Sequence, residues 1–376
     1  MKIPFNKPFL SGRELKNIRS AYLRGELAGD GYFTKKCQHW LEKNLGSKKA
    51  FLTHSCTSAL EMAAILADIK PGDEVIMPSF TFVSTANAFV LRGGVPVFVD
   101  IRPDTLNIDE NLIEKAITRK TKAIVPVHYA GVGCEMDIIL KIARRHGLLV
   151  IEDAAHGLKA TYKGKELGTM GDLGALSFHE TKNIISGEGG ALLVNNPKFI
   201  KRAEIVWQKG TDRSRFIRGE VDKYTWRDVG SSFLPGELIA AFLWAQLLQS
   251  SKITKKREVA WKYYLEQLKS LNPQGLWNLP KTDKTRKPNG HIFYILAPKK
   301  KLRNRLMNHL KLKKISCLRH YEPLHRSEFQ QKLKKRNQLP ITDSIAGRIL
   351  RLPMFADLTQ KLQKKICNHI LKFTSE

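Results

Sequence analysis

One lysine of this sequence stands between a strand-like run and a glycine-rich turn. The run Ala175–His179 leads into Glu180-Thr181-Lys182-Asn183, and Gly187-Glu188-Gly189-Gly190 follows at once. A lysine amine that loses its proton condenses with a carbonyl group, and a site with little water favours that loss. A single lysine in so lysine-rich a chain is usually a solvated surface residue. The strand before Lys182 and the glycines after it favour a nucleophile instead.

An aspartate at the end of a second apolar run could work with this lysine. Asp153 follows Val150-Ile151-Glu152, and the small residues after it would let a flat ring approach the backbone. A carboxylate in this position can pair with a protonated pyridine nitrogen. The alternative for Asp153 is the N-cap of a helix that follows the strand. His156 could hydrogen-bond a phenolic oxygen, although a lone histidine is more often a structural group.

A polar turn before an apolar helix predicts a phosphate site. Ser55-Cys56-Thr57-Ser58 opens the expected helix Thr57–Ile69, and the free N–H groups and positive dipole at a helix N-terminus bind phosphate. Thr57 and Ser58 are the expected donors, and Ser177 is expected to reach in from its strand. An ordinary N-cap is the alternative, and it is compatible with phosphate binding.

Together these features predict a site for pyridoxal 5'-phosphate (PLP). Lys182 would form the Schiff base, Asp153 would hold the ring nitrogen protonated, and the polar turn would bind the phosphate. Phe82 could stack on the ring, although an aromatic residue there is otherwise part of the core, and Phe80 is the competing candidate. Gly131-Val132-Gly133 lacks the third glycine of a dinucleotide fingerprint, and neither a P-loop nor a His-Glu-x-x-His motif occurs. We therefore expect no metal.

Short apolar strands alternate with helical stretches in the first part of the chain. Strands are expected at Ala50–Thr53, Glu74–Met77, Val95–Asp100, Ala123–His128, Leu148–Asp153, Ala175–His179 and Ala191–Asn195. Helices between them include Thr57–Ile69, Glu135–His146 and Lys198–Trp207. This alternation predicts an α/β fold with a mostly parallel, seven-stranded sheet flanked by helices. Ligands of such sheets bind beyond the carboxyl ends of the strands, where Asp153 and Lys182 are expected.

The pattern changes after Trp226. Glu237 to about Leu268 is predicted as one long helix that connects two domains, and Pro273–Gly290 as a loop. A strand is then expected at His291–Ala297, with helices at Leu302–Leu312, Ser344–Leu350 and Leu358–Phe373. We thus predict a large domain over residues 1–245 and a smaller C-terminal α+β domain over residues 246–376.

The charge of the chain raises the question of a nucleic-acid partner. Sixty-four Lys and Arg against 35 Asp and Glu give a net charge of +29. The positive runs gather in the last third of the chain, for example Lys255-Lys256-Arg257, Lys299-Lys300-Lys301 and Lys334-Lys335-Arg336. Aromatic residues do not interleave with them, and no nucleic-acid-binding motif is evident. A solvated basic surface is therefore favoured, and it would still attract an anionic substrate.

The remaining composition indicates a cytoplasmic protein. The first residues lack the apolar region of a signal peptide, and no apolar run approaches a membrane span. The cysteines are odd in number and dispersed, without a Cys-x-x-Cys, at positions Cys37, Cys56, Cys134, Cys317 and Cys367. This usage argues for a reducing compartment and against a disulfide framework or zinc site.

With these residues in place, the sequence resembles the DegT/DnrJ/EryC1/StrS sugar aminotransferases nearly from end to end. The resemblance is carried by Gly29–Thr34, Pro71–Gly93, Val125–Ala130, Ser177–Asn183 and Asp222–Ser232. It implies the fold-type I PLP architecture and transfer of an amino group from L-glutamate to a dTDP-linked keto sugar. Relatives that dehydrate sugars carry histidine where the Schiff-base lysine would be, so Lys182 favours transamination.

The resemblance also implies roles for single residues. It makes Lys182 the Schiff-base lysine and Asp153 the pyridinium partner, and it places His156 near the phenolic oxygen. It places Phe82 over the ring and gives the phosphate three contacts, Thr57, Ser58 and Ser177.

A homodimer with shared active sites follows from the same resemblance. The Asp228–Phe233 region would contact the neighbour's phosphate or substrate. Many members have asparagine where this chain has Ser232, and arginine where it has Leu234. A serine still donates one hydrogen bond, so Ser232 is kept as a candidate. His320, in His320-Tyr321-Glu322-Pro323-Leu324-His325, matches a motif near the sugar nucleotide and implies a substrate contact.

Overall fold

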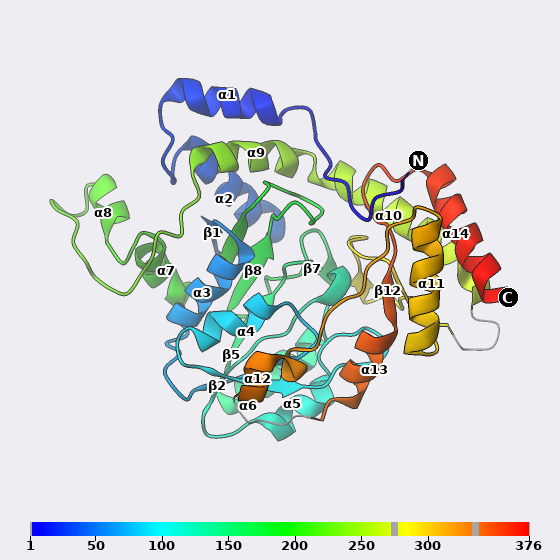
Figure 1. Cartoon of the computed structure of the whole chain (residues 1–376). Helices are drawn as coiled ribbons and strands as arrows, with labels where there is room; N and C mark the ends of the chain where they lie inside the picture. Colours follow the sequence, from blue (N-terminus) through cyan, green and yellow to red (C-terminus); the bar gives the residue numbers. More distant parts are fainter. Residues whose placement is uncertain (1, 272–276, 333–337, 376) are drawn as a thin grey trace.

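A computed structural model describes residues 2–271, 277–332 and 338–375. Its centre is a seven-stranded sheet with the order β1-β9-β8-β5-β4-β2-β3 (Figure 1). These strands are β1 (Lys49–Thr53), β2 (Glu74–Pro78), β3 (Val95–Val99), β4 (Thr121–Ile124), β5 (Leu149–Asp153), β8 (Leu173–Ser177) and β9 (Gly190–Val194). The strands are parallel except for β9, which runs antiparallel to both β1 and β8. All seven predicted strands and the mostly parallel sheet are confirmed.

Helices cover both faces of the sheet because its strands alternate apolar side chains between two cores. On β1, for example, Leu52 belongs to one core and Phe51 to the other. The first core takes its helical residues mainly from α2 (Tyr32–Leu45), α5 (Glu110–Ala116), α6 (Met136–His146) and α9 (Glu237–Leu248). The second takes them from α3 (Cys56–Leu66), α4 (Val83–Val90) and α7 (Ile200–Trp207). Helix α1 (Glu14–Arg24) lies on α9, and α8 (Arg213–Ile217) projects from the body (Figure 1).

The local sequence explains which face of helix α6 is buried and where the helix stops. Helix α6 buries Met136, Ile139, Ile142 and Ala143, a spacing that places one apolar stripe against the sheet. It ends at Gly147, whose φ of 66° is in the left-handed region that glycine adopts at little cost.

A buried carboxylate anchors the middle of the sheet. Glu152, in β5, is fully buried, and its two oxygens accept hydrogen bonds from three N–H groups of the segment Gly168–Gly171 at 2.6 to 2.8 Å. His128 adds a fourth bond from Nε2 at 2.8 Å. The N–H of Cys134 donates to His128 Nδ1, which assigns the ring proton to Nε2. Because neighbours in a strand point to opposite faces, Asp153 is turned to the other side of β5.

A third hydrophobic core lies in the C-terminal part of the chain. It combines residues of α10 (Ser250–Gln267), α11 (Lys300–Leu312) and α14 (Gln360–Ser375) with the antiparallel pair β11 (Tyr294–Leu296) and β12 (Ile349–Arg351). The N-terminal segment runs back to this core, where Ile3 is buried and forms a bridge to Ile315 (Figure 1). The domain division at residue 245 stays a prediction.

Shorter elements complete the described chain. A three-stranded sheet has the order β10-β6-β7, with β6 at Thr161–Tyr162, β7 at Lys165–Glu166 and β10 at Arg286–Lys287. The other helices are α12 (Glu328–Lys332), α13 (Pro340–Arg348) and the 3-10 turns η1 (Tyr129–Gly131), η2 (Pro197–Phe199), η3 (Lys269–Leu271) and η4 (Leu324–Arg326). No helix within the described ranges is both long and apolar enough to traverse a lipid bilayer.

Two predictions for the C-terminal half are wrong. The expected single helix from Glu237 to about Leu268 is two helices, because Gln249 leaves the helical conformation with φ −104° and ψ 5°. The apolar α9 packs on the first core, whereas α10 continues into the third. The expected helix Ser344–Leu350 ends at Arg348, because the next three residues pair with β11.

The predicted loop Pro273–Gly290 also changes, because it contains the short strand β10. Its first residues, Pro273–Gly275 among them, lie outside the described residues, as does the basic run Lys334-Lys335-Arg336.

We predict that Glu152→Ala lowers the free energy of unfolding by about 3–5 kcal/mol, because four buried donors lose their acceptor at once. Urea denaturation followed by circular dichroism measures this change. The exposed Glu26 gives the matched control, and Glu26→Ala should alter stability by less than about 0.5 kcal/mol. Equal stability of the two variants would contradict the anchoring role of Glu152.

Candidate active site

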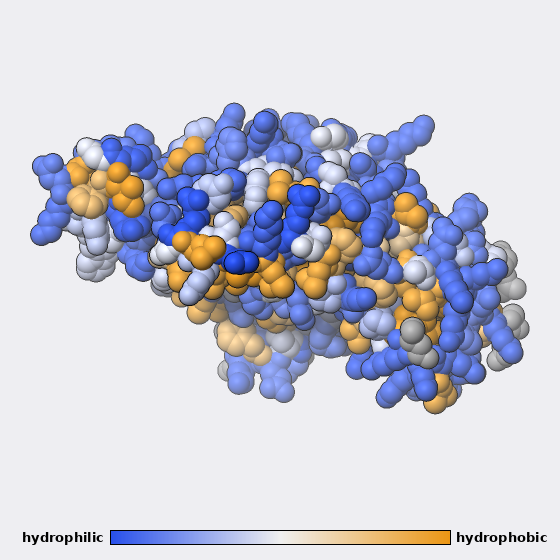
Figure 2. All heavy atoms as spheres, turned by 90° about the horizontal axis from the view of Figure 1, so that it is seen from above, coloured by the Kyte–Doolittle hydropathy of each residue, from blue (hydrophilic) through white to orange (hydrophobic). Residues whose placement is uncertain are grey.

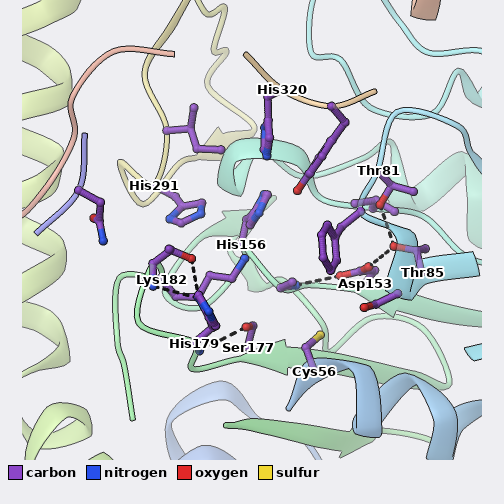
Figure 3. A pocket seen from close by; sticks show the side chains of 18 of the residues that line it. Cys56, Thr81, Thr85, Asp153, His156, Ser177, His179, Lys182, His291 and His320 are labelled. Atoms are coloured by element: carbon purple, nitrogen blue, oxygen red, sulfur yellow. Dashed lines mark hydrogen bonds between the residues drawn. The ribbon is translucent and has the colours of Figure 1, made fainter. Parts of the chain in front are cut away.

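Most of the predicted site residues line one cavity of about 660 Å³ beyond the carboxyl ends of the central strands (Figure 3). Lys182, Asp153, His156, Ser177 and Thr57 all contribute to its wall. Phe82 and His320 line it as well. The strand-end position thus brings together side chains that are far apart in the sequence.

Lys182 lies in the loop that joins β8 to β9. The antiparallel pairing of these strands continues into the loop through a bond from the Phe178 N–H to the Gly189 carbonyl at 2.8 Å. The Lys182 N–H donates to the His179 carbonyl at 2.9 Å and closes a tight turn. Burial lowers the pKa of the Lys182 amine, and the nearby Arg351 charge lowers it further, while Cys56 and Asp153 oppose the shift. A lysine with a lowered pKa is prepared for nucleophilic chemistry.

Asp153 is held by a chain of two threonines. The Thr85 hydroxyl donates to Asp153 Oδ2 at 2.7 Å, and Thr85 and Thr81 share a second bond of 2.7 Å between their hydroxyl oxygens. Since Thr85 has only one hydroxyl proton, Thr81 must be the donor in that second bond. The Ala155 N–H binds the other carboxylate oxygen at 3.1 Å. The carboxylate is therefore fixed in orientation at the cavity wall.

The N-terminus of α3 reaches the cavity because Gly190 leaves room for it. A Cβ at Gly190 would lie 2.3 Å from the carbonyl carbon of Ser55 and 2.5 Å from the Cys56 nitrogen. Ser55 Oγ accepts the Ser58 N–H at 3.1 Å, while the N–H groups of Cys56 and Thr57 lie in the first turn, where a helix offers no acceptor. Both residues line the cavity, so this helix end can bind an anion.

His156 presents a hydrogen-bond donor. Its Nδ1 accepts the N–H of Ala130 at 3.2 Å, which leaves the ring proton on Nε2. Ala130 offers this N–H from a left-handed conformation with φ 57°. Burial, with the charge of Lys182 next in importance, lowers the pKa of His156 well below its usual value, so the ring is neutral.

His291, in contrast, presents a hydrogen-bond acceptor. Its Nδ1 lies 2.9 Å from Asn183 Oδ1, an acceptor because the Asn183 amide group donates to the Asn289 carbonyl at 3.0 Å. The ring proton is therefore on Nδ1, and Nε2 carries a lone pair. Burial lowers the pKa of His291, and its ring centroid lies 4.4 Å from that of His156.

Aromatic residues close the cavity on the side of His320. The Tyr129 hydroxyl lies 3.0 Å from His320 Nδ1, and the His320 and Tyr321 rings lie 3.5 Å apart. Burial and the charges of Arg351 and Lys182 lower the pKa of His320 to about 2. Phe82 is 57% exposed and lines the cavity, whereas the competing Phe80 is 1% exposed and packs in a core.

Two predicted residues lie outside the cavity wall. Ser58 contributes its N–H to the Ser55 cap, and Ser232 forms a bridge to Gln208 on a neighbouring segment. Their proposed phosphate contacts stay predictions.

The sequence interpretation also missed cavity residues, namely Thr81, Thr85, His291, Arg351 and Tyr321. The i, i+4 spacing of Thr81 and Thr85 after a strand was a usable signal. For Arg351 there was none, because the strand that carries it was predicted as the end of a helix.

Comparison with protein families matches residues 10–371 to the DegT/DnrJ/EryC1/StrS aminotransferase family. The chain belongs to this family. The match spans nearly all of the described fold, from the segment before α1 to α14.

Similar proteins cover this aminotransferase almost completely. The uncharacterized protein MJ1066 of Methanocaldococcus jannaschii is 35% identical over 382 residues, which cover 100% of this chain and 98% of that protein. The spore coat polysaccharide biosynthesis protein SpsC of Bacillus subtilis is 32% identical over 372 residues, with 95% and 93% coverage. The solved structure of NtdA from Bacillus subtilis, with bound cofactor PMP, is 28% identical with a TM-score of 0.88, covering 100% of this chain and 86% of that one. The expected fold-type I architecture is confirmed.

We predict that Lys182 is acetylated at a lower pH than the surface lysines in protein freed of cofactor, because its lowered pKa exposes the neutral amine earlier. Competitive acetylation followed by mass spectrometry measures the half-maximal pH. In Asp153→Asn the half-maximal pH for acetylation of Lys182 should be lower still, since the carboxylate raises the Lys182 pKa. A wild-type profile equal to that of the surface lysines would contradict the electrostatic interpretation.

Proposed function

We propose that this protein is a PLP-dependent sugar nucleotide aminotransferase. It moves the amino group of L-glutamate to C4 of dTDP-4-dehydro-6-deoxy-D-glucose and gives dTDP-4-amino-4,6-dideoxy-D-galactose. The observation that carries the proposal is that Lys182 and Asp153 line the same cavity as the N-terminus of α3, whose first N–H groups have no acceptor within the helix. The product would serve surface polysaccharide synthesis, a role that the similarity to SpsC supports. The reaction would take place in the cytoplasm.

The residues present fit PLP. Its phosphate matches the first turn of α3, where Gly190 keeps space for the backbone of Ser55 and Cys56. The ring nitrogen matches the Asp153 carboxylate, which two hydrogen bonds already orient. The exposed ring of Phe82 offers an aromatic face. Thr57, Ser58 and Ser177 are the proposed phosphate contacts within the chain, and Ser232 is the proposed contact to the phosphate in the partner subunit's site.

Each group of the cavity has a chemical task in this proposal. PLP supplies a carbonyl that condenses with amines and a ring that accepts electrons. Lys182 holds and returns the proton at the donor carbon, since its lowered pKa makes the neutral amine available. Asp153 keeps the proton on the ring nitrogen. His156 donates from Nε2 to the phenolic oxygen, a direction that the Ala130 N–H enforces.

The substrate assignment rests on the resemblance of Pro71–Gly93 and Asp222–Ser232 to enzymes that form dTDP-4-amino-4,6-dideoxygalactose in enterobacterial common antigen synthesis. His320 is the proposed substrate contact in the cavity. The alternative is the same chemistry on another keto sugar, with a C3 amine, a gluco product or a GDP or UDP donor. A non-catalytic nucleic-acid-binding protein is less well supported, because the complete Lys182 and Asp153 pair would then have no task.

A homodimer with shared active sites is part of the proposal. Apolar side chains interrupt the hydrophilic surface over α1 and at the projecting α8 end (Figure 2). Leu15 and Leu23 of α1 are 80% and 70% exposed, and Trp226, near α8, is 81% exposed. Exposed apolar patches of this kind support an interface with a second copy. The neighbouring Asp228–Phe233 segment would then contact the partner's site.

We predict that Lys182→Ala abolishes turnover, because among the described residues no second lysine lines the cavity to move the proton. Purified protein is incubated with PLP, glutamate and the keto sugar, and amino sugar is measured by chromatography. Lys165, an exposed lysine of β7, gives the control Lys165→Ala, which should keep full activity. Turnover by Lys182→Ala would refute the assignment.

The product configuration tests the substrate separately. We expect an axial amine at C4 in the NMR spectrum of the product. An equatorial amine, or a C3 amine with a different keto sugar, would keep the PLP chemistry and move the enzyme to another sugar pathway.

A further inference from the structure

Two arginines of the described residues line the cavity, and their guanidinium groups differ in their hydrogen bonding. Arg257, in α10, is 3% exposed and donates to the Gly290, His291 and Met354 carbonyls at 3.2, 2.8 and 3.2 Å. These bonds tie α10 to the segments before β11 and after β12. Arg257 is therefore occupied by the structure of the fold.

Arg351 keeps part of its binding capacity free. It is the last residue of β12, and Nη2 donates to the Arg319 carbonyl at 3.2 Å. Its Nε is buried without a hydrogen-bond partner. Among the described residues, no carboxylate forms an ion pair with this guanidinium. A buried donor without an acceptor is costly, so a ligand atom at this position would be stabilising.

The rigid surroundings of Arg351 keep this donor in place. Its backbone exchanges hydrogen bonds with Leu318 at 2.8 and 3.2 Å, and β12 pairs with β11. The Phe5 ring, which also lines the cavity, lies 4.8 Å from its guanidinium carbon. An arginine keeps its charge at neutral pH even when burial lowers its pKa.

The charge acts directly on the reacting region. The guanidinium lines the same cavity as Lys182, His156, His291 and His320. Its charge adds to the burial that lowers the pKa values of these four groups. Those histidines are neutral, whereas Arg351 is charged. It is thus a fixed cation on the cavity wall that Lys182 also lines, and its Nε–H is a donor without an acceptor.

We propose that Arg351 binds a carboxylate of the amino donor. This inference rests on the proposed function. An amino acid whose amine approaches Lys182 carries a carboxylate on the same carbon. This negatively charged acceptor must therefore enter the cavity together with the amine. The forked donors of a guanidinium match a carboxylate, and such charge-assisted bonds are among the strongest in proteins. The keto sugar needs no such cation near C4, because its diphosphate is attached at C1, on the opposite side of the ring.

The test separates the two substrates. Glutarate, a dicarboxylate without an amine, is titrated into the PLP-loaded enzyme by calorimetry. The rates of cofactor amination by glutamate and of deamination by the keto sugar are followed by absorbance. In Arg351→Met, the dissociation constants for glutarate and glutamate should rise at least about tenfold, while saturation by the keto sugar changes less than about threefold.

Controls keep the result specific. Arg348→Met removes the same charge from the end of α13, outside the cavity, and should bind glutarate normally. Arg351→Lys, which keeps a point charge, should show an intermediate loss and serves if the methionine variant does not fold. Unchanged glutamate and glutarate affinity would overturn the proposal, as would a loss confined to the keto sugar.

The proposed function can fail independently. If wild-type enzyme accepts glutamate but aminates no dTDP sugar, the substrate assignment fails, and the glutarate titration still decides the role of Arg351.

Discussion

The site depends on a constraint within one central strand. In β5, Glu152 and Asp153 are consecutive, so one carboxylate is directed into the sheet's packing and the other into the cavity. Glu152 cannot be buried alone, and its four donors come from the segment 168–171 and from His128. These bonds fix the position of β5 relative to the segments beside it. Asp153 is therefore positioned by an interaction on the face it does not occupy.

Neutral histidines surround the charged groups of the cavity. Burial lowers the pKa values of His156, His291 and His320, so none of them competes with Lys182 for positive charge. Their directions are set by neighbours: Ala130 makes His156 a donor into the cavity, and Asn183 makes His291 an acceptor. Polar groups with fixed direction need no rearrangement during proton transfer, which is an advantage for catalysis.

The features that could be predicted from the sequence are those that a local sequence pattern determines. The seven central strands follow from short apolar runs, and Lys182 and Asp153 follow from their places after those runs. The break at Gln249 could not be foreseen, because both helices have strong helical composition and only their separate packing divides them. Strand β12 could not be predicted for a similar reason, since its three residues pair with β11, which lies more than fifty positions earlier in the sequence. The histidine tautomers depend on bonds between distant segments, and no single motif encodes them.

The bridge between Ile3 and Ile315 has a consequence for how the chain folds. These residues are more than three hundred positions apart, yet they pack in the same core. Contacts between distant positions are slow to form, because a long loop must close before they add stability. During synthesis the first residues emerge long before their partners do. We therefore expect the central sheet to assemble early, and the wall formed by Phe5 and Arg351 to form after it. The proposed carboxylate contact at Arg351 would then form in a later step of folding than the central sheet.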